Sequence, residues 1–78
     1  MKGGKRVTFV GDSIKQFLGE ICKIMSNQYN ISALSASNCI INTHFDAFVR
    51  SNYLLVKSKS IDYWADVIYT KSNLGETF

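Results

Sequence analysis

The stretch KRVTFVGDSIKQFLGEICKIM, residues 5–25, holds two hydrophobic patterns in succession. Residues 5–10 alternate polar and apolar side chains, which predicts a short β-strand because neighbouring strand residues point to opposite faces. After Gly11, apolar residues recur every three or four positions, which predicts an amphipathic helix capped by Asp12 or Ser13. The apolar face of this helix comprises Ile14, Phe17, Leu18, Ile21, Ile24 and Met25. Gly19 interrupts the same helix and would permit close approach by another helix.

A second helix is predicted to begin at Ser35, its expected N-cap, and to end near residues 51–52. Residues 27–30 precede it as a turn, and residues 31–34 are expected to be extended or irregular. The segment 53–56 fits either a continued helix or a short strand. The apolar face of the second helix comprises Cys39, Ile40, Ile41, His44, Phe45, Phe48 and Val49.

A third helix is predicted after Ser60, with Asp62 in its first turn and Lys71 near its end, as suits the helix dipole. Residues 72–78 are interpreted as a tail. Tyrosines and one tryptophan are frequent between residues 53 and 69, which favours packing in the core or in a dimer interface. Binding of another protein through this C-terminal segment, or stacking on single-stranded nucleic acid, is the alternative. The apolar face of the third helix comprises Ile61, Trp64, Val67 and Ile68.

With 78 residues the chain is expected to form one domain, and oligomerisation is expected because so short a chain buries little of its surface. Nine Lys and Arg residues against six Asp and Glu give a net charge of +3, which favours an anionic partner. No apolar run has the length of a membrane span, so we expect a cytoplasmic protein with no membrane partner. Cys22 and Cys39 are interpreted as small buried hydrophobes in a reducing compartment.

The sequence offers little for catalysis. His44 is the only histidine, and it has no acidic residue at helical spacing with which to form a metal site or a catalytic triad. Gly3, Gly4 and Gly11 lack the spacing and the following Lys-Ser/Thr of a phosphate-binding loop. We therefore expect no enzyme, no cofactor and no metal.

A lone strand at residues 5–10 has no predicted partner in its own chain. Pairing with the same strand of a second copy would form a two-fold antiparallel ribbon that fits the major groove of B-form DNA. Val7 and Phe9 would then face the helices. The outward face of the ribbon would comprise Arg6, Thr8 and Val10.

Three short stretches resemble the ribbon-helix-helix family of the Arc, MetJ and CopG type. They are Arg6-Val7-Thr8-Phe9-Val10, Asp12-Ser13-Ile14 and Leu34-Ser35-Ala36-Ser37, within residues 5–50. Among relatives, the N-terminal domain of the conjugative-plasmid protein TraM looks similar. The resemblance implies a mostly α fold: a ribbon-helix-helix homodimer with an extra C-terminal helix. Its divisions would be a flexible arm at 1–4, the DNA-binding unit at 5–52 and a helical extension at 53–78.

The resemblance also implies site residues on double-stranded DNA. Arg6, Thr8 and Val10 would contact bases, Arg6 by a two-pronged bond to guanine. Val10 departs from the polar residue expected there and offers only apolar contact. Backbone amides at the start of the second helix would hold a phosphate. The phosphate contacts would comprise Lys2, Lys5, Ser35, Ala36 and Ser37.

Two interpretations of the function and one alternative fold follow. The first is a sequence-specific dimeric DNA-binding protein, either a transcriptional repressor or an accessory factor at a plasmid or phage DNA site. The second is a small phage- or plasmid-encoded inhibitor or adaptor that binds a host protein. In the third, the strand at 5–10 pairs with residues 54–56 in an α+β fold, which would remove the reason for a dimer.

Overall fold

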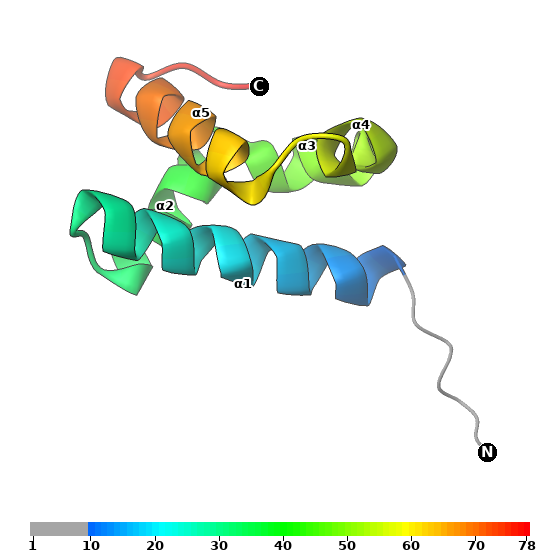
Figure 1. Ribbon diagram of the computed structural model, residues 1–78. Helices are drawn as coiled ribbons and strands as arrows, with labels where there is room; N and C mark the ends of the chain where they lie inside the picture. Colours follow the sequence, from blue (N-terminus) through cyan, green and yellow to red (C-terminus); the bar gives the residue numbers. More distant parts are fainter. Residues whose placement is uncertain (1–9) are drawn as a thin grey trace.

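The computed structural model describes the backbone of residues 10–78 and the side chains of residues 13–78, and this part contains five α-helices and no strand (Figure 1). The prediction of a mostly α fold is confirmed. The helices are α1 (Val10–Tyr29), α2 (Ala33–Asn42), α3 (Phe45–Ser51), α4 (Tyr53–Lys57) and α5 (Ile61–Leu74).

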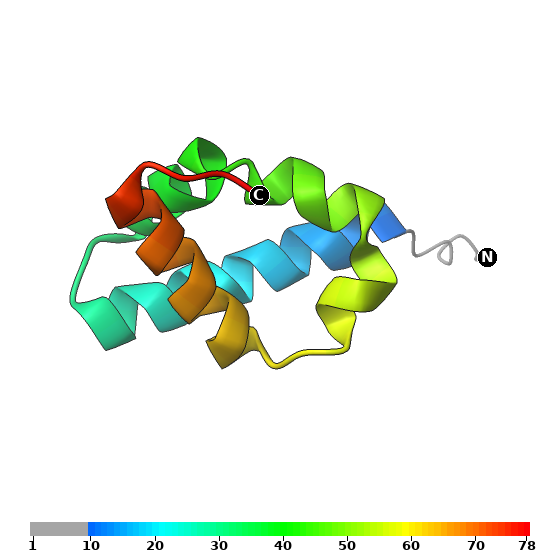
Figure 2. The ribbon, with the colours of Figure 1, turned by 90° about the horizontal axis from the view of Figure 1, so that it is seen from above.

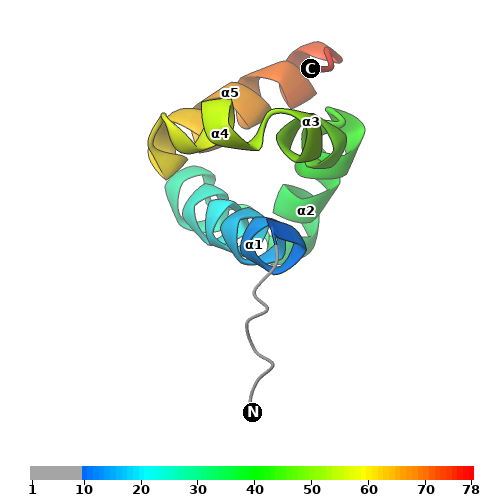
Figure 3. The ribbon, with the colours of Figure 1, turned by 90° about the vertical axis from the view of Figure 1, so that its right-hand side faces the viewer.

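The helices surround one common core. Helix α5 crosses over α1, with α2 and α3 along the back (Figures 1 and 2). Viewed along α1, the helices are arranged around a centre (Figure 3) that the apolar side chains fill. The core therefore joins residues on both sides of the predicted boundary at residues 52–53, since Val56 and Trp64 pack in the same cluster as Ile21 and Met25.

Helix α1 carries the predicted amphipathic pattern. Its Ile14, Phe17, Ile21 and Met25 are buried, and they recur at intervals of three and four residues. The helix begins at Val10, before the predicted cap at Asp12 or Ser13, so the position of that cap was wrong. Val10 is also the last residue of the predicted strand, and it belongs to the helix instead. Residues 5–9 lie outside the described residues.

Helix α2 begins three residues earlier than predicted, since its N-cap is Ser32. Asn30 adopts the left-handed conformation (φ 56°) and ends α1, and the Ile31 amide then donates back to the Ser26 carbonyl at 3.2 Å. The chain emerges with Ser32 extended, and the Ser32 hydroxyl accepts the Ser35 amide at 3.0 Å. Ser32, and not Ser35, is therefore the N-cap.

The predicted second helix is broken at Thr43 and His44. The buried Thr43 hydroxyl donates to the carbonyls of Cys39 (2.8 Å) and Ile40 (3.1 Å), and His44 then adopts a left-handed conformation with φ 62°. This break redirects α3. It leaves Ile41 and His44 exposed, so the prediction that both lie on the buried face was wrong, whereas Phe45 is fully buried.

The segment 53–56, which fitted either a helix or a strand, belongs to helix α4. Asn52 separates α3 from α4 with φ −131° and ψ 37°, and its amide and side-chain nitrogen both donate to the Phe48 carbonyl. The α+β alternative required residues 54–56 to be a strand. The helical structure of this segment contradicts it.

Helix α5 has the predicted cap, because Ser60 Oγ accepts the Tyr63 amide at 3.1 Å. Gly75 ends the helix in the left-handed conformation (φ 71°), where the absence of a Cβ removes the steric penalty. The residues that follow are not a free tail. Phe78 turns back toward α3, and its amide donates to the Thr43 carbonyl at 2.9 Å.

Aromatic side chains make the contacts that hold α5 against α4 and α1. The Trp64 indole is buried and donates to the Val56 carbonyl at 2.7 Å. Tyr69 stacks on Tyr29 of α1 with ring centroids 3.8 Å apart, and the Tyr29 hydroxyl donates to Asp66 at 3.1 Å. The prediction that the aromatic C-terminal third is core is confirmed for Trp64.

Candidate functional site

The residues predicted to read DNA fall mostly outside the described part of the chain. Four of them lie outside the described residues: Lys2, Lys5, Arg6 and Thr8. The fifth, Val10, is the first residue of α1. Their contact with DNA stays a prediction.

The predicted phosphate-binding residues lie in the first turns of α2. The amides of Ser35 and Ala36 already donate within the chain, to the Ser32 hydroxyl and the Ser32 carbonyl, each at 3.0 Å. Ser35 is exposed, Ser37 is half-buried and Ala36 is fully buried. Two of the three predicted amides are thus already hydrogen-bonded within the chain, one to the cap side chain and one to the backbone.

Helix α1 separates the two parts of the predicted DNA site. A helix of 20 residues is about 30 Å long, and α2 begins near the end of α1 that is opposite to Val10 (Figure 1). One chain therefore does not bring Val10 and the Ser35–Ser37 turn together.

The positive charge is unevenly distributed along the sequence. Residues 1–6 include Lys2, Lys5 and Arg6 and no acidic residue, whereas residues 10–78 carry six Lys and Arg and six Asp and Glu. The helical domain is therefore electroneutral overall. Any nonspecific attraction to polyanions would come chiefly from the first six residues.

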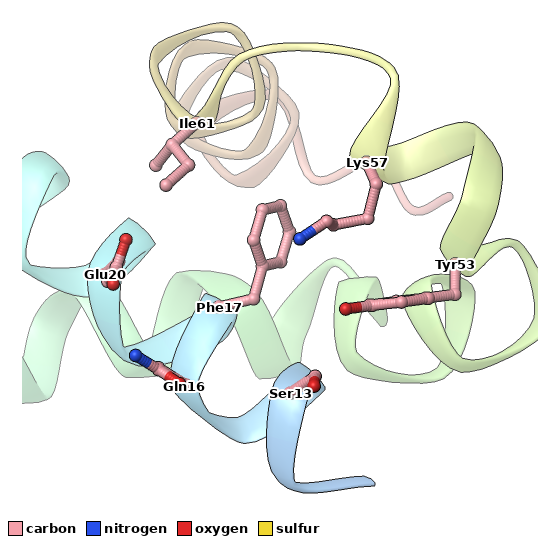
Figure 4. Close-up of a pocket in the computed structure, with 7 residues that line it drawn as sticks. All are labelled: Ser13, Gln16, Phe17, Glu20, Tyr53, Lys57 and Ile61. Carbon is pink, nitrogen blue, oxygen red and sulfur yellow. The ribbon is translucent and has the colours of Figure 1, made fainter. Parts of the chain in front are cut away.

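A polar cleft of about 330 Å³ lies where α1, α4 and α5 meet. Figure 4 shows Tyr53 and Lys57 reaching from α4 toward Phe17 of α1. The Lys57 ammonium lies 5.6 Å from the centroid of the Tyr53 ring, within cation–π range. Gln16, Glu20 and Lys57 are exposed, so water screens the charges of Glu20 and Lys57.

A more apolar groove runs along the other side of α1, between α1 and the α2–α3 segment. Two adjoining cavities of about 420 Å³ and 300 Å³ share Gly19 and Cys22. We call this surface the α1–α2 groove. Its lining comprises Ile14, Lys15, Leu18, Gly19, Cys22, Lys23, Ser26 and Asn27 of α1, Ala33, Ser37, Ile40 and Ile41 of α2, and Asp46 and Arg50 of α3.

Gly19 opens the middle of this groove. A Cβ atom built on Gly19 would meet no atom within 4 Å, so within the described residues nothing packs against this point of α1. Ile41 borders the groove with 56% of its surface exposed, and Leu34, seven residues earlier on the same side of α2, is 71% exposed. The predicted close approach at Gly19 is therefore available to a segment from outside the described structure.

Cys22 lies in the floor of the groove as a half-buried free thiol. Burial, and secondarily the nearby Cys39, raises the pKa of the Cys22 thiol. Cys22 thus stays protonated near neutral pH and contributes to the floor as an apolar group. Cys39 is also free and half-buried, so both cysteines are less buried than predicted.

The described residues do not gather their metal-binding side chains into a site. His44 is exposed, and no cluster of three His, Cys, Asp or Glu side chains could hold an ion there. Within the same residues, no helix is both long and apolar enough to cross a bilayer.

Sequence reasoning located Gly19 but did not find the groove. Its second wall depends on Ile41, which the sequence pattern assigned to the core. The available signal was the seven-residue spacing of Leu34 and Ile41, which puts both on one side of α2, apart from the buried pair Ala36 and Ile40.

Comparison with protein-family models, curated proteins and solved structures finds no match for this chain.

Proposed function

We propose that this protein is a non-enzymatic interaction domain that binds another protein in the α1–α2 groove. The observation that carries the proposal is the open stretch of α1 around Gly19, flanked by the exposed side chain of Ile41. Exposed apolar surface of this kind is typical of protein-binding sites.

The character of the other surfaces supports a binding role. In the polar cleft, the two charged side chains, Glu20 and Lys57, are exposed to water, which weakens any electrostatic effect they could have on a bound molecule. Cys22 has a raised pKa, which is the opposite of what activates a thiol nucleophile. We therefore assign the function to recognition and not to chemistry.

In-cell photo-crosslinking tests this proposal. A photoreactive phenylalanine analogue would replace Ile41 in the groove or, as a control, Thr70 on the exposed side of α5. We expect a discrete protein adduct from position 41 in the native cells, identified by mass spectrometry and absent from position 70. Adducts that are equal at both positions, or that nuclease treatment removes, would contradict a protein partner in the groove.

Sequence-specific binding of double-stranded DNA is the second candidate. It is favoured by the concentration of the positive charge in residues 1–6, and its finer form is the ribbon-helix-helix homodimer acting as a repressor or DNA-site accessory factor. One argument for the dimer is weaker, because α5 covers α1 within one chain and the helices bury their core without a second copy.

Mobility shift at two salt concentrations tests the DNA candidate. Specific binding would persist at the higher salt on some fragments only, and Arg6→Ala and Thr8→Ala would abolish it without changing the helical circular dichroism spectrum. A shift that salt removes equally from every fragment would exclude the specific regulator.

A further inference from the structure

We propose that the partner segment in the α1–α2 groove is an acidic amphipathic helix. This inference rests on the proposed function and adds the chemistry of the ligand. It follows from the length of the groove, from its apolar floor and from the sign of the charges along its rim.

The groove has the dimensions of a helix-binding site. Its lining on α1 extends from Ile14 to Asn27, and at 1.5 Å per helical residue this corresponds to about 20 Å. A ligand helix of three to four turns would cover that length. Gly19 lies near the middle, where the absence of a side chain lets a second backbone approach closely.

The floor would bind the apolar face of such a helix. Leu18 and the Cys22 thiol are half-buried on α1, and Ile41 offers its exposed side chain from α2. A helix recognised in a groove presents apolar side chains at positions i, i+3 or i+4, and i+7. Leu18 and Cys22 are four residues apart on one face of α1, and Ile41 adds an apolar contact from α2.

The rim selects the charge of the ligand. Lys15 and Lys23 lie on either side of Gly19 along α1, and Arg50 borders the same groove from α3. Among the described lining residues the one acid is Asp46, whose Oδ2 is 3.9 Å from Arg50 Nη1. Glu20, the remaining acid of this part of α1, lines the cleft with Lys57 instead. The rim thus carries a net positive charge that complements acidic side chains.

The same charges disfavour a second copy of this chain in the groove. If two α1 helices crossed antiparallel at Gly19, Lys15 of each would lie beside Lys23 of the other, because both lysines are four residues from the crossing point. Two lysine side chains placed side by side repel each other, because both carry a positive charge. Duplex DNA matches the rim, but it has no apolar face for Leu18 and Ile41.

Fluorescence anisotropy with a defined probe tests the inference on the full chain. The probe is a fluorescein-labelled 16-residue helical peptide with leucine at i, i+4, i+7 and i+11 and glutamate at most other positions. A second peptide has lysine in place of every glutamate, and unlabelled duplex DNA serves as a competitor. We expect saturable binding of the acidic peptide, weakened by salt, with no binding of the lysine peptide and no competition by DNA.

Matched variants locate the binding site. The double variant Lys15→Glu/Lys23→Glu reverses the rim, and Lys57→Glu/Lys59→Glu makes the same charge change at α4 and the loop after it. We expect at least a tenfold loss of affinity from the first and less than a twofold change from the second. Gly19→Leu fills the open middle of the groove and should also weaken binding at least tenfold, while its helical circular dichroism spectrum stays unchanged.

Equal effects of the two double variants, equal binding of both peptides, displacement by DNA, or no saturation up to about 1 mM acidic peptide would each overturn the inference. These outcomes are distinct from failure of the proposed function. A groove-specific protein adduct from position 41, without acidic-peptide binding, would retain the protein partner and reject only its acidic helical character.

Discussion

Phe78 packs its ring in an aromatic cluster with side chains of α3. Its centroid lies 5.0 Å from that of Phe45 and 4.9 Å from that of Phe48. Full burial makes a Phe to Ala change cost about 3–5 kcal/mol, and Phe78 is half-buried, so we expect Phe78→Ala to lower the free energy of unfolding by about 1–3 kcal/mol. Urea denaturation measures this. Thr77→Ala, a change at the exposed neighbour, is the control, and equal effects of the two variants would contradict the packing of Phe78.

Two glycines, one inside α1 and one at the end of α5, should respond oppositely to the same substitution. Gly19 lies inside α1 with open space around it, so Gly19→Ala should stabilise the protein by about 0.5–1 kcal/mol through helix propensity. Gly75 has φ 71°, which an alanine adopts only with strain, so Gly75→Ala should destabilise by about 1 kcal/mol. Thermal unfolding measures both changes. Destabilisation by Gly19→Ala would show that another segment of the chain already occupies the groove.

The Cys22 thiol should react slowly with alkylating reagents near neutral pH. Its pKa is raised by burial first and by Cys39 second, and the thiolate is the reactive form. The alkylation rate should therefore lag behind that of an unfolded control at pH 8 and keep rising above pH 9. Because the fold favours the neutral thiol, this contribution to stability is present below the ordinary thiol pKa and is lost as the pH rises through the raised one. Mass spectrometry after timed iodoacetamide treatment measures the rate, and faster reaction than in the unfolded control would contradict it.

At the scale of elements, the structure and the sequence pattern differ in which serine is the N-cap of α2. Ser32 Oγ accepts the Ser35 amide, so Ser32→Ala should cost about 1 kcal/mol, whereas Ser35→Ala, at an exposed position inside α2, should cost less than about 0.5 kcal/mol. Equilibrium unfolding of the two variants checks this order. If Ser35→Ala lowered the free energy of unfolding more than Ser32→Ala did, Ser35 would be the cap and the observed cap at Ser32 would be contradicted.

The helices with regular periodicity were predictable from the sequence. The buried residues of α1 and the Ser60 cap of α5 follow from spacing and capping chemistry alone. The break between α2 and α3 was not predictable in the same way, because no glycine or proline marks it. There, the Thr43 hydroxyl bonds to the preceding turn and His44 takes a left-handed conformation, and both depend on the surrounding packing.

At the scale of the whole molecule, the candidate site was less predictable than the fold. Which helix covers which face is set by tertiary packing: α5 packs against α1, and within the described residues nothing packs against α1 at Gly19. The sequence indicated a dimer because a lone strand and a short chain both need a partner. The helical core, in contrast, closes within one chain from Ile14 to Ile68.

The electroneutral helical domain and the basic first six residues make two separable predictions about binding. Contacts with a protein helix would involve α1 and α2, whereas contacts with DNA phosphates would depend on Lys2, Lys5 and Arg6. The two modes use different parts of the chain. One experiment that reports on every residue can therefore distinguish them.

That experiment is a titration of the ¹⁵N-labelled full chain with the acidic amphipathic peptide, followed by amide chemical shifts. We expect the largest shifts at residues 15–27 of α1 and 33–41 of α2, with little change at the cleft residues Tyr53 and Lys57. Shifts confined to residues 1–9, or centred on α4, would contradict the α1–α2 groove as the binding surface of this protein.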